Sequence, residues 1–134
     1  MITSYVVYEG ELHTRLTHER SGEEIETDAP VDNHGRGSAF SPTDLLATSL
    51  ASCMLTMMGI KCLHLKYDLE GASCAVKKVM GDDPRRVSEI HIEMELPEGA
   101  DEKTRQILEN TALTCPVAKS IHPDIQQNII INWA

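Results

Sequence analysis

The stretch from Leu45 to Ile60 constrains the fold most, because it is apolar or small at nearly every position and carries no charge. Its length predicts a helix from Pro42 to about Lys61 or Leu63. A helix that is apolar on nearly all faces is typical of one that is buried on all sides. A single small domain cannot easily surround such a helix. The sequence therefore predicts that two copies pack against each other as a homodimer.

The start of this helix carries its own signals. Ser41 is a candidate N-cap, Pro42 fits the first helical position, and Asp44 occupies the third position of a capping box. The preceding residues, 32–38, are polar and rich in glycine. They lack the full pattern of a phosphate-binding loop and are interpreted as a connector.

The other segments predict short strands and one further helix. Apolar and polar residues alternate before and after the turn at Arg20–Gly22, which predicts an antiparallel N-terminal β-meander. Beyond the long helix we expect strands at Lys66–Val79 and Val87–Leu96, an amphipathic helix opening at Asp101, and a last strand at Asn128–Trp133. The predicted fold class is α+β: β-meander, long buried central helix, β-hairpin, second helix and C-terminal strand.

Length and charge narrow the functional classes. The chain of 134 residues is the size of one domain, covering residues 1–134. A net charge of −9 disfavours nucleic-acid binding, because it repels a phosphate backbone. The apolar stretch is shorter than the ~20 residues that cross a bilayer, and the N-terminus lacks the pattern of a secretory signal. We therefore expect a cytoplasmic protein without a membrane partner.

Four cysteines are present, and two of them lie in settings that favour thiol chemistry. Cys53 lies in the middle of the apolar helix, and Cys115 directly precedes Pro116. A proline at a first helical position would place the Cys115 sulfur near exposed backbone N–H groups, which favour an anion. Cys62 and Cys74 are interpreted as small apolar residues in the core. No Cys-x2-Cys spacing is present, so we expect no metal.

A reactive Cys53 requires a lowered pKa, because the thiolate is the nucleophile. Cys53 lies eleven residues after Pro42, too far for the dipole of its own helix to act. Candidate cations in the preceding segments are Arg15, Arg20 and Arg36, and Asp44 could orient one of them.

Whether Cys53 and Cys115 meet cannot be derived from their spacing of 61 intervening residues. If they do, the first thiolate could attack an electrophilic oxygen to give a sulfenic acid. The second thiol could then condense with it to give a disulfide and water. This is the chemistry of a thiol peroxidase.

The sequence resembles the OsmC/Ohr family of osmotically inducible and organic hydroperoxide resistance proteins. The resemblance lies in the run from Phe40 to Ala47, in Ser52-Cys53-Met54, and in Cys115-Pro116-Val117, and it covers essentially the whole chain. It implies an α+β fold in an intertwined homodimer with two active sites at the interface. It further implies that Cys53 is the peroxidatic thiol and Cys115 the resolving thiol.

The resemblance also implies a substrate and a reductant. Peroxidases of the family reduce organic hydroperoxides with dithiols such as dihydrolipoyl groups, and need no bound cofactor. Their reactive cysteine lies near an arginine and a glutamate. Here Thr43 stands at the position of that glutamate, which leaves Asp44 as the nearby acid, with Arg15 or Arg20 as the arginine. This departure indicates a general OsmC-like branch.

Two other classes stay open on the sequence. One is a non-enzymatic dimer whose thiols sense oxidation or help to bind a small apolar ligand. The other is a purely structural dimerisation domain, whose thiols would react only after denaturation.

Overall fold

The computed structural model describes all 134 residues, which form two compact units, Met1–Leu46 and Ala47–Ala134. Helix α1 (Pro42–Cys62) begins in the first unit and runs into the second. The prediction of one domain over residues 1–134 stays a prediction.

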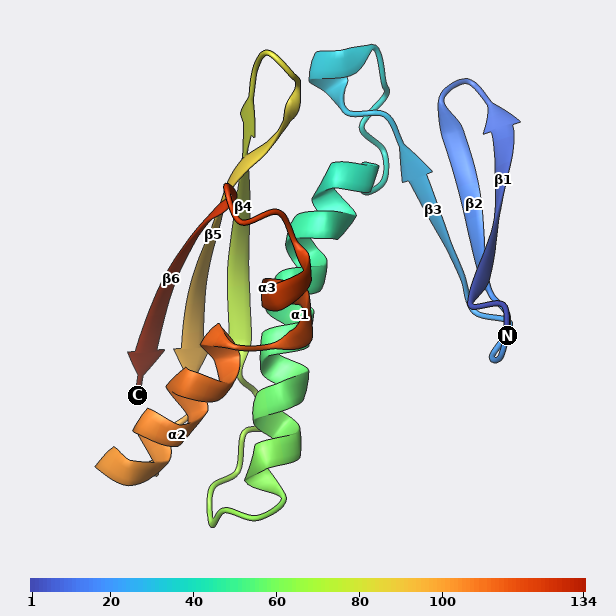
Figure 1. Ribbon diagram of the computed structural model, residues 1–134. Helices are drawn as coiled ribbons and strands as arrows, with labels where there is room; N and C mark the ends of the chain where they lie inside the picture. The colour runs from blue at the N-terminus through green and yellow to red at the C-terminus, as the bar shows by residue number, and fades with distance from the viewer. The chain divides into compact units, whose positions relative to one another are not determined.

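The first unit contains a three-stranded antiparallel sheet that confirms the predicted meander (Figure 1). Its strands, in the order β1-β2-β3, are β1 (Ser4–Gly10), β2 (His13–His18) and β3 (Glu24–Asp28). Val6 pairs with Leu16 and Leu16 with Ile25, so these side chains lie on one face, which is apolar. Val7 pairs with Arg15 and lies on the opposite face, which carries most of the charge.

The segment between β3 and α1 is a packed connector. A 3₁₀ turn spans Val31–Asn33, and a Cβ atom at Gly35 would lie 1.6 Å from the carbonyl oxygen of Ala29, so only glycine fits there. The predicted capping box is confirmed. The Ser41 amide donates to Asp44 Oδ2 at 3.0 Å, and the Asp44 amide donates to Ser41 Oγ at 3.0 Å.

The second unit packs helices on a mixed sheet of order β4-β5-β6 (Figure 1). Strand β5 pairs antiparallel with β4 and parallel with β6, because α2 and α3 carry the chain back across the sheet. The elements of this unit after α1 are β4 (Ser73–Gly81), β5 (Arg86–Leu96), α2 (Glu102–Leu113), α3 (Pro116–Ser120) and β6 (Gln126–Trp133). The predicted order of a hairpin, a helix and a last strand is confirmed.

The core lies between this sheet and the helices. Alternate residues of β5 from Ile90 to Leu96 point into it, as the period of a half-buried strand requires. Leu108 and Ala112 close it from α2. Helix α1 contributes Ala47, Leu50, Ala51, Met54 and Met58.

The single chain covers only part of α1, and the prediction that a second copy covers the rest stays a prediction. One face packs into the core, whereas an uncharged stripe on the other face is exposed to solvent. The stripe consists of Leu46, Ser49, Ser52, Thr56 and Ile60. Spacings of three and four residues keep these positions in line along the helix. The single chain therefore leaves this side of α1 uncovered.

The predicted strand at Lys66–Val79 is wrong in its first part, because β4 begins only at Ser73. The Tyr67 hydroxyl donates to the carbonyl oxygen of Pro97 at 2.5 Å, which anchors the segment after α1 outside the sheet. Gly71 has a φ of +94°, which turns the chain just before the strand.

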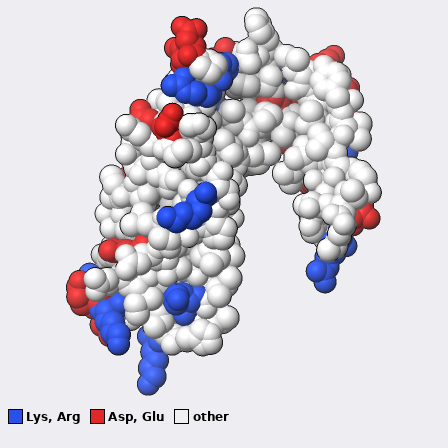
Figure 2. All heavy atoms as spheres, in the orientation of Figure 1, with Lys and Arg blue, Asp and Glu red and all other residues white.

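Charged side chains are spread over the surface. On the face shown in Figure 2 the lysines and arginines lie apart and form no continuous basic patch. Helix α1 is long and apolar enough to cross a membrane by length and composition. The core helix of a soluble protein passes the same test.

Candidate functional site

The structure brings the thiols of Cys53 and Cys115 into contact within the second unit. Cys53 lies in the middle of α1 and is partly buried, whereas Cys115 directly precedes α3 and is 1% exposed. The Cys53 side chain lies close enough to Cys115 to raise the pKa of that thiol. Both cysteines are free thiols. A pair that the sequence could only hypothesise is therefore a neighbouring pair in the fold.

Cys115 is the N-cap of α3, as the following proline predicted. The backbone N–H of Ala118 donates to its sulfur at 3.4 Å. Burial raises the pKa of Cys115, the amides of Ala118 and Val117 lower it, and the neighbouring Cys53 sulfur raises it again. The net direction is upward, so Cys115 keeps its proton near neutral pH. Such a thiol suits the resolving role better than the attacking one.

The other two cysteines have settings that suppress reactivity. Burial raises the pKa of Cys62 and of Cys74, and the carboxylate of Asp68 adds to the rise at Cys62. Both pack against the hydrophobic core. These observations agree with the packing role predicted for them.

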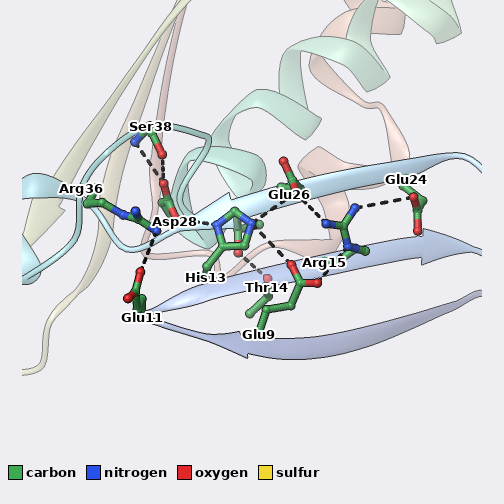
Figure 3. A network of polar contacts seen from close by, with 11 residues as sticks. Glu9, Glu11, His13, Thr14, Arg15, Glu24, Glu26, Asp28, Arg36 and Ser38 are labelled. Carbon is green, nitrogen blue, oxygen red and sulfur yellow. Dashed lines mark hydrogen bonds and ion pairs between the residues drawn. The ribbon is translucent and has the colours of Figure 1, made fainter.

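Arg15 lies on the charged face of the first unit, where three glutamates surround its guanidinium (Figure 3). Its Nε lies 3.0 Å from Glu9 Oε2, its Nη2 3.0 Å from Glu26 Oε1, and its Nη1 3.6 Å from Glu24 Oε1. These carboxylates, Glu9 above all, raise the pKa of Arg15. A role for Arg15 at the Cys53 thiolate stays a prediction, and it would require the guanidinium to exchange one of these partners.

The other charged residues predicted to act at Cys53 are Arg20, Arg36 and Asp44. Arg20 lies exposed in the turn after β2, and Arg36 is paired with Glu11 at 3.4 Å. The Asp44 carboxylate accepts the Ser41 amide as part of the helix cap. The catalytic roles assigned to Arg20 and Asp44 are not tested by this geometry.

His13 connects the glutamate network to a buried carboxylate (Figure 3). Its Nδ1 lies 2.6 Å from Oδ1 of Asp28, which is 1% exposed and also accepts both the amide and the hydroxyl of Ser38. Its Nε2 lies 3.3 Å from Glu26 Oε1 and 3.6 Å from Glu9 Oε1. Glu9, His13 and Glu26 could hold a metal ion by position, although such an ion would compete with Arg15 for both glutamates.

This network predicts a stability that depends on pH. The hydrogen bonds to Asp28 and Glu26 raise the pKa of His13, whereas those from Ser38 and His13 lower the pKa of Asp28. The His13 contribution is present below its unfolded pKa of about 6.5 and is lost as pH rises through its higher folded value. The Asp28 contribution is present above about 3.9 and is lost as pH falls through its lower folded value.

We therefore expect His13→Gln to abolish the part of the stability decline that occurs above pH ~6.5. The measurement is the urea midpoint at fixed protein concentration across a pH series. His122→Gln is the matched control, because the His122 side chain is exposed and its nearest carboxylate lies 3.8 Å away. An unchanged pH profile in His13→Gln would contradict the assignment.

A small pocket lies at the C-terminal end of α1 in the second unit. It has a volume of about 290 Å³ and is lined by Met57, Ile60, Lys61, His64, Thr111 and Thr114. Met57 lies one helical turn after Cys53, and Thr114 immediately precedes Cys115. The sequence analysis did not single out these residues. The available signal was that Lys61 and His64 follow the uncharged stretch from Leu45 to Ile60.

Comparison with known proteins shows the family of this chain. The family model described as OsmC-like protein matches residues 35–129. The chain belongs to the OsmC-like family. A crystal structure of a candidate osmotic stress induced and detoxification response protein from Psychrobacter arcticus is 61% identical, with a TM-score of 0.95. The match covers 98% of this chain and 96% of that one.

More distant OsmC-like structures share the fold. An organic hydroperoxide resistance protein from Elizabethkingia anophelis is 14% identical with a TM-score of 0.76, and 100% of this chain and 98% of that one are covered. The organic hydroperoxide resistance protein OsmC from Legionella pneumophila is 17% identical with a TM-score of 0.68, and 98% of each chain is covered. No curated protein sequence is significantly similar. Family membership confirms the α+β OsmC-like fold and supports a stress-related redox role.

Proposed function

We propose that this OsmC-like protein is a cysteine-based peroxidase that reduces organic hydroperoxides to alcohols. The observation that carries the proposal is the contact between the partly buried Cys53 thiol and the buried, protonated Cys115 thiol. Two thiols in contact can form a disulfide without a large movement of the chain.

The reaction begins at Cys53. Its thiolate attacks the distal oxygen of the hydroperoxide, the O–O bond breaks, and the departing alkoxide takes up a proton to become the alcohol. Cys53 is then a sulfenic acid. The Cys115 sulfur attacks the Cys53 sulfur, and the Cys115 proton leaves with the displaced hydroxide as water. An external dithiol, such as a lipoyl group on a protein, returns both cysteines to thiols and is itself oxidised to a disulfide. The proposal includes no metal and no bound cofactor.

The proposed assembly is a homodimer. Two uncovered surfaces without charge support it: the exposed stripe of α1, and the apolar face of the first sheet that carries Val6, Tyr8 and Ile25. Exposed apolar patches on a soluble protein mark interaction surfaces. A second copy offers the same uncharged helix stripe, which is what a two-fold interface requires.

The test is a rapid-mixing measurement of peroxide loss, with intact-mass and peptide analysis of the protein. Reduced protein should consume cumene hydroperoxide faster than hydrogen peroxide and form a Cys53–Cys115 disulfide. A dithiol should then restore both thiols and permit further turnover. Slow loss of both peroxides with all thiols intact would refute the peroxidase.

One observation favours a second candidate, a thiol sensor. The Arg15 guanidinium has three glutamate partners and would have to exchange one of them to bind a thiolate. A Cys53 without a cationic partner would react more slowly. Formation of the disulfide without recycling by any dithiol would support a sensor rather than an enzyme.

A further inference from the structure

We propose that Glu9, His13 and Glu26 form a binding site for one Zn²⁺ ion on the charged face of the first sheet (Figure 3). The inference goes beyond the proposed function and does not depend on it, because all three residues belong to the first unit. Each comes from a different strand, and their ligand atoms lie within 4.8 Å of one another. Imidazole nitrogens and carboxylate oxygens are ligands of Zn²⁺ in proteins. The missing Cys-x2-Cys spacing does not bear on a site of this kind.

The His13 ring is held in place from the side away from the glutamates. Its Nδ1 lies 2.6 Å from Oδ1 of the buried Asp28 carboxylate. The amide and the hydroxyl of Ser38 donate to the other oxygen of Asp28, so this carboxylate accepts hydrogen bonds at both oxygens. Nδ1 therefore carries a proton, and Nε2 of the neutral ring has a free lone pair. A histidine that donates to a carboxylate through one ring nitrogen and binds the metal through the other is the usual arrangement at zinc sites.

Three acceptor atoms converge on the other side of the ring. Nε2 of His13 lies 3.3 Å from Glu26 Oε1 and 3.6 Å from Glu9 Oε1. None of the three can donate to another when His13 is neutral, so they repel one another unless a proton or a metal cation lies between them. Ligands held about 2.0–2.2 Å from Zn²⁺ in a tetrahedron lie roughly 3.3–3.6 Å apart. The two distances from Nε2 fit that geometry.

The charge of this face favours a divalent ion over a proton. Four carboxylates surround one guanidinium, that of Arg15, which leaves a net charge of −3 when His13 is neutral. A Zn²⁺ ion cancels two of these charges, whereas a proton on His13 cancels only one. The carboxylates are those of Glu9, Glu24, Glu26 and Asp28.

Zn²⁺ and Arg15 compete directly at one oxygen atom. Glu9 contacts Arg15 through Oε2 and faces His13 with Oε1, so it can serve both partners at once. Glu26 uses Oε1 for both contacts. An ion bound to this oxygen would displace Nη2 of Arg15 and leave the guanidinium with Glu9 and Glu24. Removal of the Arg15 charge should therefore strengthen zinc binding.

The test is a calorimetric titration of ZnCl₂ into the full chain at neutral pH, after a chelator has removed bound metal. The chain carries Cys53→Ser and Cys115→Ser, so that the thiol pair cannot bind the ion. We expect one equivalent to bind. His13→Gln should weaken binding by at least about tenfold. Glu9→Gln should also weaken it, and this change leaves the contact between His13 and Asp28 in place.

His18→Gln is the matched control, because His18 lies on the same strand and its ring contacts Ser21 instead of a carboxylate. Its zinc affinity should be unchanged. Arg15→Gln should strengthen binding by roughly two- to fivefold, since it removes a competing cation. Thermal unfolding of each variant without metal confirms that the variant is folded.

Three results would overturn the site. One is the absence of saturable binding of one equivalent. Another is a loss of affinity in His18→Gln as large as in His13→Gln, which would show an adventitious ion only. The third is weaker binding in Arg15→Gln. Calorimetry does not depend on peroxide chemistry, so a failure of the proposed peroxidase would leave this result unaffected.

Discussion

Cys53→Ser is expected to lower the rate of hydroperoxide reduction by at least about 1,000-fold, because a serine hydroxyl cannot take up the peroxide oxygen as a sulfenic acid does. Cys115→Ser should behave differently. It should consume one equivalent of hydroperoxide and then stop, with the oxygen retained on Cys53. A serine at position 115 is a favourable N-cap for α3, so this variant should keep the local fold.

The measurement is a single-turnover assay with one equivalent of hydroperoxide, in which a sulfenic-acid reagent marks the product by mass. Cys62→Ser is the matched control. Cys62 also lies on α1, is also partly buried, and has a pKa raised by burial. It should retain full turnover. Equal losses in the Cys53 and Cys62 variants would show that damage to the helix, rather than removal of the nucleophile, abolished the activity.

The local signals in the sequence predicted the elements of the fold well. Ser41, Pro42 and Asp44 defined the start of α1 because a capping box depends on neighbouring residues only. Alternating apolar residues predicted β5, and Pro116 predicted the N-cap at Cys115. The start of β4 was predicted seven residues too early, since the contact between Tyr67 and Pro97 joins residues 30 positions apart and leaves no local signal.

The candidate site depended on information that the sequence does not contain. The contact between Cys53 and Cys115 is long-range, and only the resemblance to a family suggested their roles. The partners of Arg15 are similarly non-local, because Glu9 and Glu26 reach it from two neighbouring strands. The charge of Arg15 was visible in the sequence, but its neutralisation by three glutamates was not. The pocket at Lys61 required the end of α2 to pack against α1.

The second large effect concerns assembly, and two neighbouring valines provide the test. Val6 and Val7 are 62% and 58% exposed and lie on opposite faces of β1. Val6 shares the apolar face with Leu16, whereas Val7 pairs with Arg15 on the face that carries the glutamates. If the partner chain covers the apolar face, Val6→Lys would bury an unpaired charge in the dimer. The dimer dissociation constant should then rise by roughly 100-fold or more.

Val7→Lys makes the same change on the face where Glu9, Glu24 and Glu26 can accept a cation, so the dimer should persist. Sedimentation velocity over a range of protein concentrations measures both variants against the unaltered chain. A monomeric unaltered chain would refute the proposed homodimer outright. Dissociation by Val7→Lys but not by Val6→Lys would place the partner on the charged face. That face holds Arg15. A partner chain bound there would be in a position to replace the glutamates that contact the Arg15 guanidinium, and the cation that stabilises the Cys53 thiolate would then be sought at the interface.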